Sequence, residues 1–168
     1  MSRARGLLWG AAPIFLSLLF CARVAAEPPS LNIADTVIEI PLAEDVSMDD
    51  AVESMKLRAN VLNFKLVAHQ PLYKELQAMG LDSKRIEIFQ FCDARIAKSM
   101  IDYDKDFAAY LPCRITLLED EEGKAWLITM NLDMLIQSAK LPPELMKSAL
   151  RVKNSIQEIM EAGAAGEL

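Results

Sequence analysis

The chain has 168 residues and a formal net charge of −6, with 52% hydrophobic and 25% charged residues. This length fits a single domain, and the composition is that of a globular protein rather than a disordered one. An acidic surface repels phosphate backbones, so we expect no nucleic-acid partner.

Residues 1–26 have the pattern of a signal peptide. Two arginines precede an apolar run of about 15 residues, and small residues lead to Ala26. The run is shorter than the roughly 20 apolar residues that span a bilayer, so we expect cleavage near Ala26, no stable membrane insertion afterwards, and a periplasmic location. Cleavage also removes Cys21 and three positive charges, which changes the net charge from −6 to −9. The alternatives are a retained anchor or a lipid-modified Cys21, and the bulky Phe20 disfavours the second.

Local patterns predict a single α+β domain. Its mainly antiparallel sheet has four or five strands, and its helices pack on one face of that sheet. Alternating or β-branched stretches predict strands near residues 36–40, 63–69, 85–92, 113–118 and 125–130. Helical spacing and capping residues predict helices near 47–62, 71–79, 93–101, 107–110, 131–139 and 144–162. The expected segments are the signal peptide (1–26), the N-terminal arm and first strand (27–46), the α+β core domain (47–140), and the C-terminal helix and tail (141–168).

Three local details are specific enough to test. Residues 27–35 are expected to form an extended arm. The segment Phe89–Cys92 breaks the alternation of its strand, which indicates a bulge or a strand end covered on both faces. Gly163 is expected to end the last helix, and the residues after it are expected to fray.

The last predicted helix carries an apolar stripe at steps of three and four residues. This stripe packs either on the sheet of its own chain or on the sheet of a partner subunit. A helix lying on a membrane surface is disfavoured, because its basic and acidic residues balance. The stripe consists of Leu145, Ala149, Val152, Ile156 and Ile159.

Several short stretches resemble a known family. They are the early helix at 51–54, the strand end Phe91-Cys92, the entry Leu111-Pro112-Cys113-Arg114, the acidic hairpin before Trp126, and the stretches 130–133 and 141–144. On these residues, the chain resembles an exported subgroup of the bacterial domain-of-unknown-function family number 302. The resemblance implies a compact α+β fold and leaves a homodimer open. It implies no activity, and no catalytic residue is assigned from it.

Cys92 and Cys113 are the cysteines that remain after cleavage. They lie 21 positions apart, at the two ends of a connection between predicted strands, and neither belongs to a Cys-x-x-Cys pair. Thiols that meet in the periplasm usually oxidise, so a structural disulfide is one interpretation. Two buried unpaired thiols, a functional dithiol, and a metal or haem ligand are the others.

A ligand pocket is expected between the sheet and the helices, near both cysteines. Its expected lining is Phe91, Tyr110, Arg114 and Trp126. His69 is the single histidine, and with both cysteines it would make three metal ligands. Type-one copper takes two imidazoles, so this set does not fit it. No metal site and no cofactor are predicted, while haem and copper stay open as alternatives.

These patterns favour an exported, non-enzymatic protein that binds a small ligand or serves as an accessory factor. The ligand itself is not indicated. The alternative from another class is a thiol-dependent redox or sulfur-handling protein that uses Cys92 and Cys113. The state and the exposure of the two thiols distinguish these functions.

Overall fold

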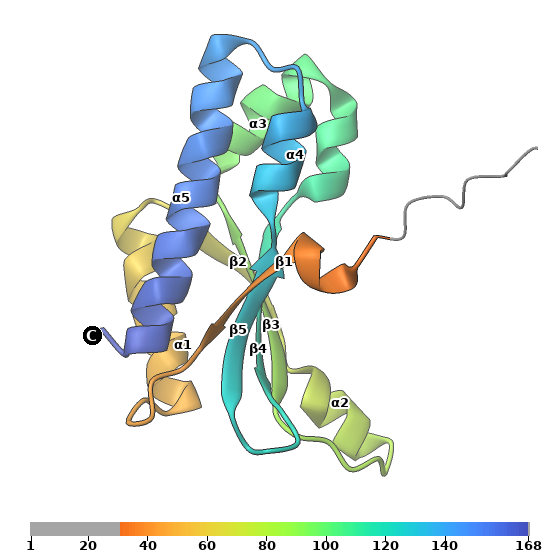
Figure 1. Ribbon diagram of the computed structural model, residues 1–168, viewed down its shortest axis with the longest axis vertical. Coiled ribbons are helices and arrows are strands. Elements are labelled where there is room, and N and C mark those ends of the chain that lie inside the picture. The colour runs from red at the N-terminus through yellow and green to blue at the C-terminus, as the bar shows by residue number, and fades with distance from the viewer. Residues whose placement is uncertain (1–30, 168) are drawn as a thin grey trace, which may run out of the picture. The chain divides into compact units, whose positions relative to one another are not determined.

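The structure is a computed structural model that describes residues 31–167 (Figure 1). The predicted signal peptide, its cleavage site near Ala26 and Cys21 lie outside the described residues. Within residues 31–167, no helix is both long enough and apolar enough to cross a membrane.

Five strands form one sheet in the order β1-β5-β4-β3-β2. Every neighbouring pair is antiparallel, which confirms the predicted α+β class and the antiparallel sheet. The first strand lies at one edge, so the predicted N-terminal segment contributes to the same sheet as the predicted core. The strands are β1 (Val37–Pro41), β2 (Lys65–Gln70), β3 (Ile86–Cys92), β4 (Cys113–Glu119) and β5 (Ala125–Met130).

The helices lie in three places around the sheet (Figure 1). Two of them, α1 and α5, lie side by side against one face. The short α2 lies near the end where the β4–β5 hairpin turns, and α3 and α4 gather at the opposite end with η2. The α-helices are α1 (Met48–Val61), α2 (Leu72–Ala78), α3 (Ala94–Tyr103), α4 (Leu132–Ser138) and α5 (Pro143–Ala165), and the 3-10 helices are η1 (Ile33–Thr36) and η2 (Lys105–Tyr110).

The core lies between α1, α5 and one face of the sheet. Alternation along the strands sends every second side chain to this face, where Phe89, Ile115 and Leu127 are fully buried. Ile156 and Ile159 of α5 are buried in the same cluster. The part of the apolar stripe at Ile156 and Ile159 therefore packs on the sheet of its own chain, one of the two predicted arrangements.

Gly163 lies inside α5 rather than at its end, so the predicted helix end and frayed tail are wrong. The helix continues to Ala165, and Gly166 caps it in the left-handed conformation with φ 67°. A Cβ on Gly163 would lie 2.6 Å from Met55 Cγ and 3.0 Å from Leu127 Cδ1. A glycine is needed here because α5 approaches α1 and the sheet too closely for any side chain.

Two other local predictions also require correction. β3 keeps its alternation to Cys92, and the irregular pairing lies in its partner β2, between Leu66 and Ala68. An extra residue in an edge strand bends that strand without disturbing the buried strand beside it. The described part of the N-terminal arm is not wholly extended, because η1 forms there with Asn32 as its cap.

A candidate ligand cavity with two thiols

A cavity of about 330 Å³ lies at the end of the sheet where β3 finishes and β4 begins. Its walls come from these two strand ends, α3, η2, α4 and the first half of α5. Most of the side chains that line it are apolar. They include Phe64, Phe91, Ile96, Ala97, Met100, Phe107, Leu111, Leu132, Leu135, Ile136, Leu141, Ala149 and Val152.

Asp93 sets the position of the α3 wall. It caps α3, because its Oδ1 accepts hydrogen bonds from the backbone N–H groups of Arg95 at 3.0 Å and Ile96 at 3.3 Å. Its Oδ2 lies 3.5 Å from Arg151 Nη2 on α5. The same carboxylate therefore starts α3 directly after β3 and ties this helix to the opposite wall.

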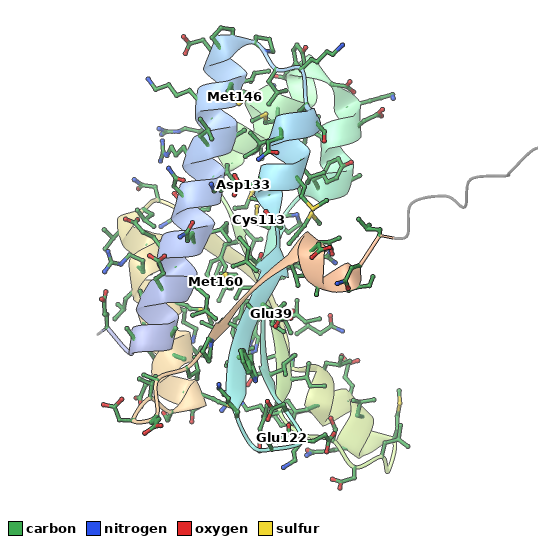
Figure 2. All side chains as sticks on the ribbon, in the orientation of Figure 1. Glu39, Cys113, Glu122, Asp133, Met146 and Met160 are labelled. Carbon is green, nitrogen blue, oxygen red and sulfur yellow. The ribbon has the colours of Figure 1, made fainter. Side chains whose placement is uncertain are left out.

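The short helix α4 forms another wall. Asn131 caps it by accepting a hydrogen bond from the N–H of Asp133 at 3.0 Å. Asp133 also pairs with Lys153 of α5 at 2.7 Å, and Figure 2 labels Asp133 where α4 runs beside α5. No residue of α4 is fully buried, although Leu132, Leu135 and Ile136 line the cavity. The helix thus covers the cavity with few other packing contacts to hold it.

Cys92 and Cys113 both line this cavity, and both are free thiols in the described structure. Cys113 lies opposite Phe91 in the β3–β4 pairing, so Cys92 follows one residue beyond that pair. The structure therefore brings the two sequence-predicted sulfur groups to one site without joining them.

Both thiols are held in their neutral form. Burial raises the pKa of Cys113 to about 11, and the nearby Cys92 adds to this effect. Burial also raises the pKa of Cys92, with a further contribution from the charge of Asp93. Since the thiolate is the nucleophile and the metal ligand, neither cysteine is activated in this state.

The four residues predicted to line a pocket lie in two places. Phe91 and Tyr110 line the cavity. Arg114 is exposed on β4, and alternation points it away from the face that carries Cys113 and Ile115. Trp126 lies at the hairpin end of β5, where its Nε1 donates a hydrogen bond to Asp120 at 2.7 Å.

Figure 2 places Cys113 at the upper part of the sheet and Glu122 at the hairpin tip. Trp126, paired with Leu118 near that tip, is therefore at the opposite end of β4 from the cavity. Arg114 and Trp126 do not share the site of the cysteines.

His69 also lies apart from the cysteines. Its ring stacks on Phe89, with centroids 4.5 Å apart, and its Nε2 contacts the buried carboxylate of Glu87. Glu87 also accepts a hydrogen bond from Arg85, which in turn pairs with Asp49 at 2.7 Å. The three-ligand set of His69 and both cysteines is thus not assembled. Among residues 31–167, no three or more His, Cys, Asp or Glu side chains form a group that could hold a metal ion.

Most of the cavity wall could not be predicted from the sequence. The helix near 93–101 was predicted, but what its apolar side covers depends on α4 and α5, which lie far away in sequence. Glu87 was missed as well. Its sequence signal was ambiguous, because Glu87 shares the alternation phase of Phe89 and Phe91, whereas Ile86 and Ile88 are apolar in the opposite phase. The structure shows that the phase of Glu87 is the buried one.

Comparison with known proteins agrees with this fold. No curated protein matches the chain. The structure is similar to the crystal structure of an uncharacterized conserved DUF302 protein from Bacillus stearothermophilus, with a TM-score of 0.65 at 16% identity, covering 76% of this chain and 97% of that one. A family model described as "Domain of unknown function DUF302" matches residues 38–163. Because this match spans most of the sequence, the chain belongs to the DUF302 family.

Proposed function

We propose that the protein is a non-enzymatic binding protein that holds a small molecule in the cavity between β3, β4, α3, η2, α4 and α5. The observation that carries this proposal is the cavity itself. Its volume of about 330 Å³ falls within the range of small-molecule sites, and its wall has the apolar character typical of them. In contrast, the core under α1 and the C-terminal half of α5 contains many fully buried side chains.

Export to the periplasm is part of the proposal, and it rests on the signal-like pattern of residues 1–26. Fractionation of cells that express the full chain, with mass spectrometry of the N-terminus, tests this part. We expect a periplasmic protein that begins at Glu27. An unprocessed cytosolic protein would contradict it.

A thiol-dependent redox function is the second candidate, because both cysteines line the same cavity. The raised pKa values argue against it as the leading function, since a thiol with a pKa of about 11 is deprotonated in only about one molecule in ten thousand at pH 7. Rapid reduction of a model disulfide by the native protein, lost in Cys113→Ala, would favour this candidate over ligand binding.

Titration with the neutral fluorescent probe aminoanthracene tests ligand binding. We expect saturable binding of one probe per chain, with enhanced fluorescence. Ala97→Leu fills the cavity from α3, and we expect it to weaken binding by about tenfold or more, equivalent to about 1.4 kcal/mol.

Ala108→Leu is the matched control, because Ala108 lies in η2, is exposed and does not line the cavity. It should leave probe binding unchanged. Absence of saturable binding in the wild type, or equal binding by Ala97→Leu, would refute the proposed site.

A further inference from the structure

We infer that the cavity selects an uncharged aromatic molecule of two or three fused rings. This inference rests on the proposed function and specifies the ligand class of that site. It follows from the charge, the hydrogen bonding, the chemistry and the volume of the cavity wall.

The wall offers no positive charge to an anion and no free negative charge to a cation. Among the described residues, the lining contains no lysine, arginine or histidine, and Asp93 is its sole acidic residue. The Asp93 carboxylate is already engaged by two backbone N–H groups and by Arg151. A charged ligand would lose its hydration here without gaining a partner, so its binding is disfavoured.

The wall also offers no unpaired buried hydrogen-bonding side chain. Ser138 lines the cavity, but its hydroxyl donates to the backbone oxygen of Met134 at 2.8 Å. Across the described residues, no buried side-chain nitrogen or oxygen lacks a hydrogen-bond partner. A ligand rich in polar groups would therefore leave its own donors and acceptors unsatisfied.

The groups that remain favour an aromatic ring over an aliphatic chain. Phe64, Phe91 and Phe107 contribute rings to the wall, and Met100 contributes a thioether beside the two thiols. Aromatic pairs and sulfur–aromatic contacts each stabilise a bound ring beyond simple burial. Because both thiols stay protonated, their sulfur atoms act as neutral, polarisable wall atoms rather than as charged ones.

The volume sets the size of the ligand. An engineered apolar cavity of about 150 Å³ in another protein holds one benzene molecule. This cavity of about 330 Å³ has roughly twice that space, which suits two or three fused rings, so both naphthalene and the aminoanthracene probe fit. Tyr110 lines the cavity and is 48% exposed, which places it at the opening rather than at the base.

A matched ligand series tests the inference in displacement experiments against aminoanthracene at pH 7. The series comprises neutral naphthalene, its carboxylate naphthoate, its cationic aminomethyl derivative, and decalin, the saturated counterpart of naphthalene. We expect naphthalene to displace the probe and both charged forms to bind about a hundredfold more weakly or not at all. Decalin should bind more weakly than naphthalene. Met100→Leu should reduce the difference in affinity between these two ligands, and it should leave the preference for neutral over charged ligands unchanged.

The possible failures are distinguishable. If naphthoate or the ammonium compound binds as tightly as naphthalene, and Ala97→Leu weakens both, the cavity is a ligand site but the inferred neutrality is wrong. If decalin binds as tightly as naphthalene, the inferred preference for aromatic ligands is wrong. If aminoanthracene does not bind at all, or if Ala97→Leu leaves every affinity unchanged, the proposed function fails and the ligand class fails with it.

Discussion

Cys92 lies one residue beyond the pair formed by Phe91 and Cys113, so the two cysteines meet at one cavity from adjacent strands without facing each other directly. Neighbouring residues of a strand point to opposite faces of a sheet, and Cys92 is the neighbour of the residue that Cys113 faces. This register therefore favours two separate thiols over a disulfide. Both thiols are free in the described structure, and their pKa values are raised. The chemistry of this pair is therefore governed by access and by pH.

Alkylation of Cys113 should be slow and strongly pH-dependent. With a pKa of about 11, its thiolate fraction rises about tenfold for each pH unit between pH 7 and pH 10, and the rate with iodoacetamide should rise in proportion. Peptide mass spectrometry of reduced, native protein measures the rate at each cysteine. Guanidinium-unfolded protein is the control, where both cysteines should react at the rate of an ordinary thiol. Fast alkylation of native Cys113 at pH 7 would contradict the burial of this thiol.

The same pKa shift predicts that stability decreases at alkaline pH. The unfolded chain loses the Cys113 proton near pH 9.0, whereas the folded chain keeps it until about pH 11. Between these values the folded state binds more protons, so unfolding becomes easier as pH rises. We expect the free energy of unfolding to fall by up to about 2 kcal/mol across this window. Urea denaturation at pH 8, 9, 10 and 11 under reducing conditions measures this decrease.

Cys113→Ala is the control for that titration. The free energy of unfolding of this variant should be lower than that of the wild type, because a buried group is lost. It should also decrease less between pH 9 and pH 11. An equally steep decrease in this variant would assign the effect to other groups.

Gly163→Ala should destabilise the protein, although alanine is the better helix former. Helix propensity alone predicts a gain of about 1 kcal/mol from removing a glycine inside α5. The added methyl would lie 2.6 Å from Met55 Cγ, 3.0 Å from Leu127 Cδ1 and 3.2 Å from the backbone oxygen of Ala51. Overpacking of this kind costs about 1–3 kcal/mol. Thermal denaturation should therefore show a lower Tm, and an unchanged or higher Tm would mean that α1 and α5 separate easily.

Local signals predicted the strands and helices because each depends on neighbours in sequence. Ser47 starts α1 by accepting a hydrogen bond from the N–H of Asp50, and Gly123 closes the β4–β5 hairpin with φ 81°. Gly163 shows the limit of this reasoning. A glycine near the end of a helical stripe has the same sequence signal whether it caps the helix or permits close packing, and tertiary contacts alone separate the two.

The cavity could be predicted only in part for the same reason. Phe91, Cys92 and Cys113 were placed together because the ends of β3 and β4 are joined by one connection. Trp126 was also predicted to line this pocket, but it lies elsewhere. The register of β5 decides which end of the sheet Trp126 reaches, and that register could not be predicted from the sequence. Pairing with Leu118 puts it beside the hairpin turn instead.

The ion pair between Asp133 and Lys153 should control how firmly α4 covers the cavity. Their side chains meet at 2.7 Å, with Lys153 only 23% exposed, while no residue of α4 is fully buried. An ion pair with this exposure contributes about 0.2–1 kcal/mol, so Lys153→Met should speed amide exchange in α4 by up to about fivefold. Aminoanthracene should also dissociate faster, because α4 opens more often. Hydrogen-exchange mass spectrometry and stopped-flow fluorescence provide these two measurements.

Lys56→Met is the matched control, because it removes the pair of Lys56 with Glu53, at 2.8 Å, on α1 and away from the cavity. It should change neither α4 exchange nor probe dissociation. Faster probe dissociation in Lys153→Met without faster α4 exchange would mean that the probe leaves past another wall. Unchanged values for both would show that the apolar contacts of Leu132, Leu135 and Ile136 hold α4 closed without help from the ion pair.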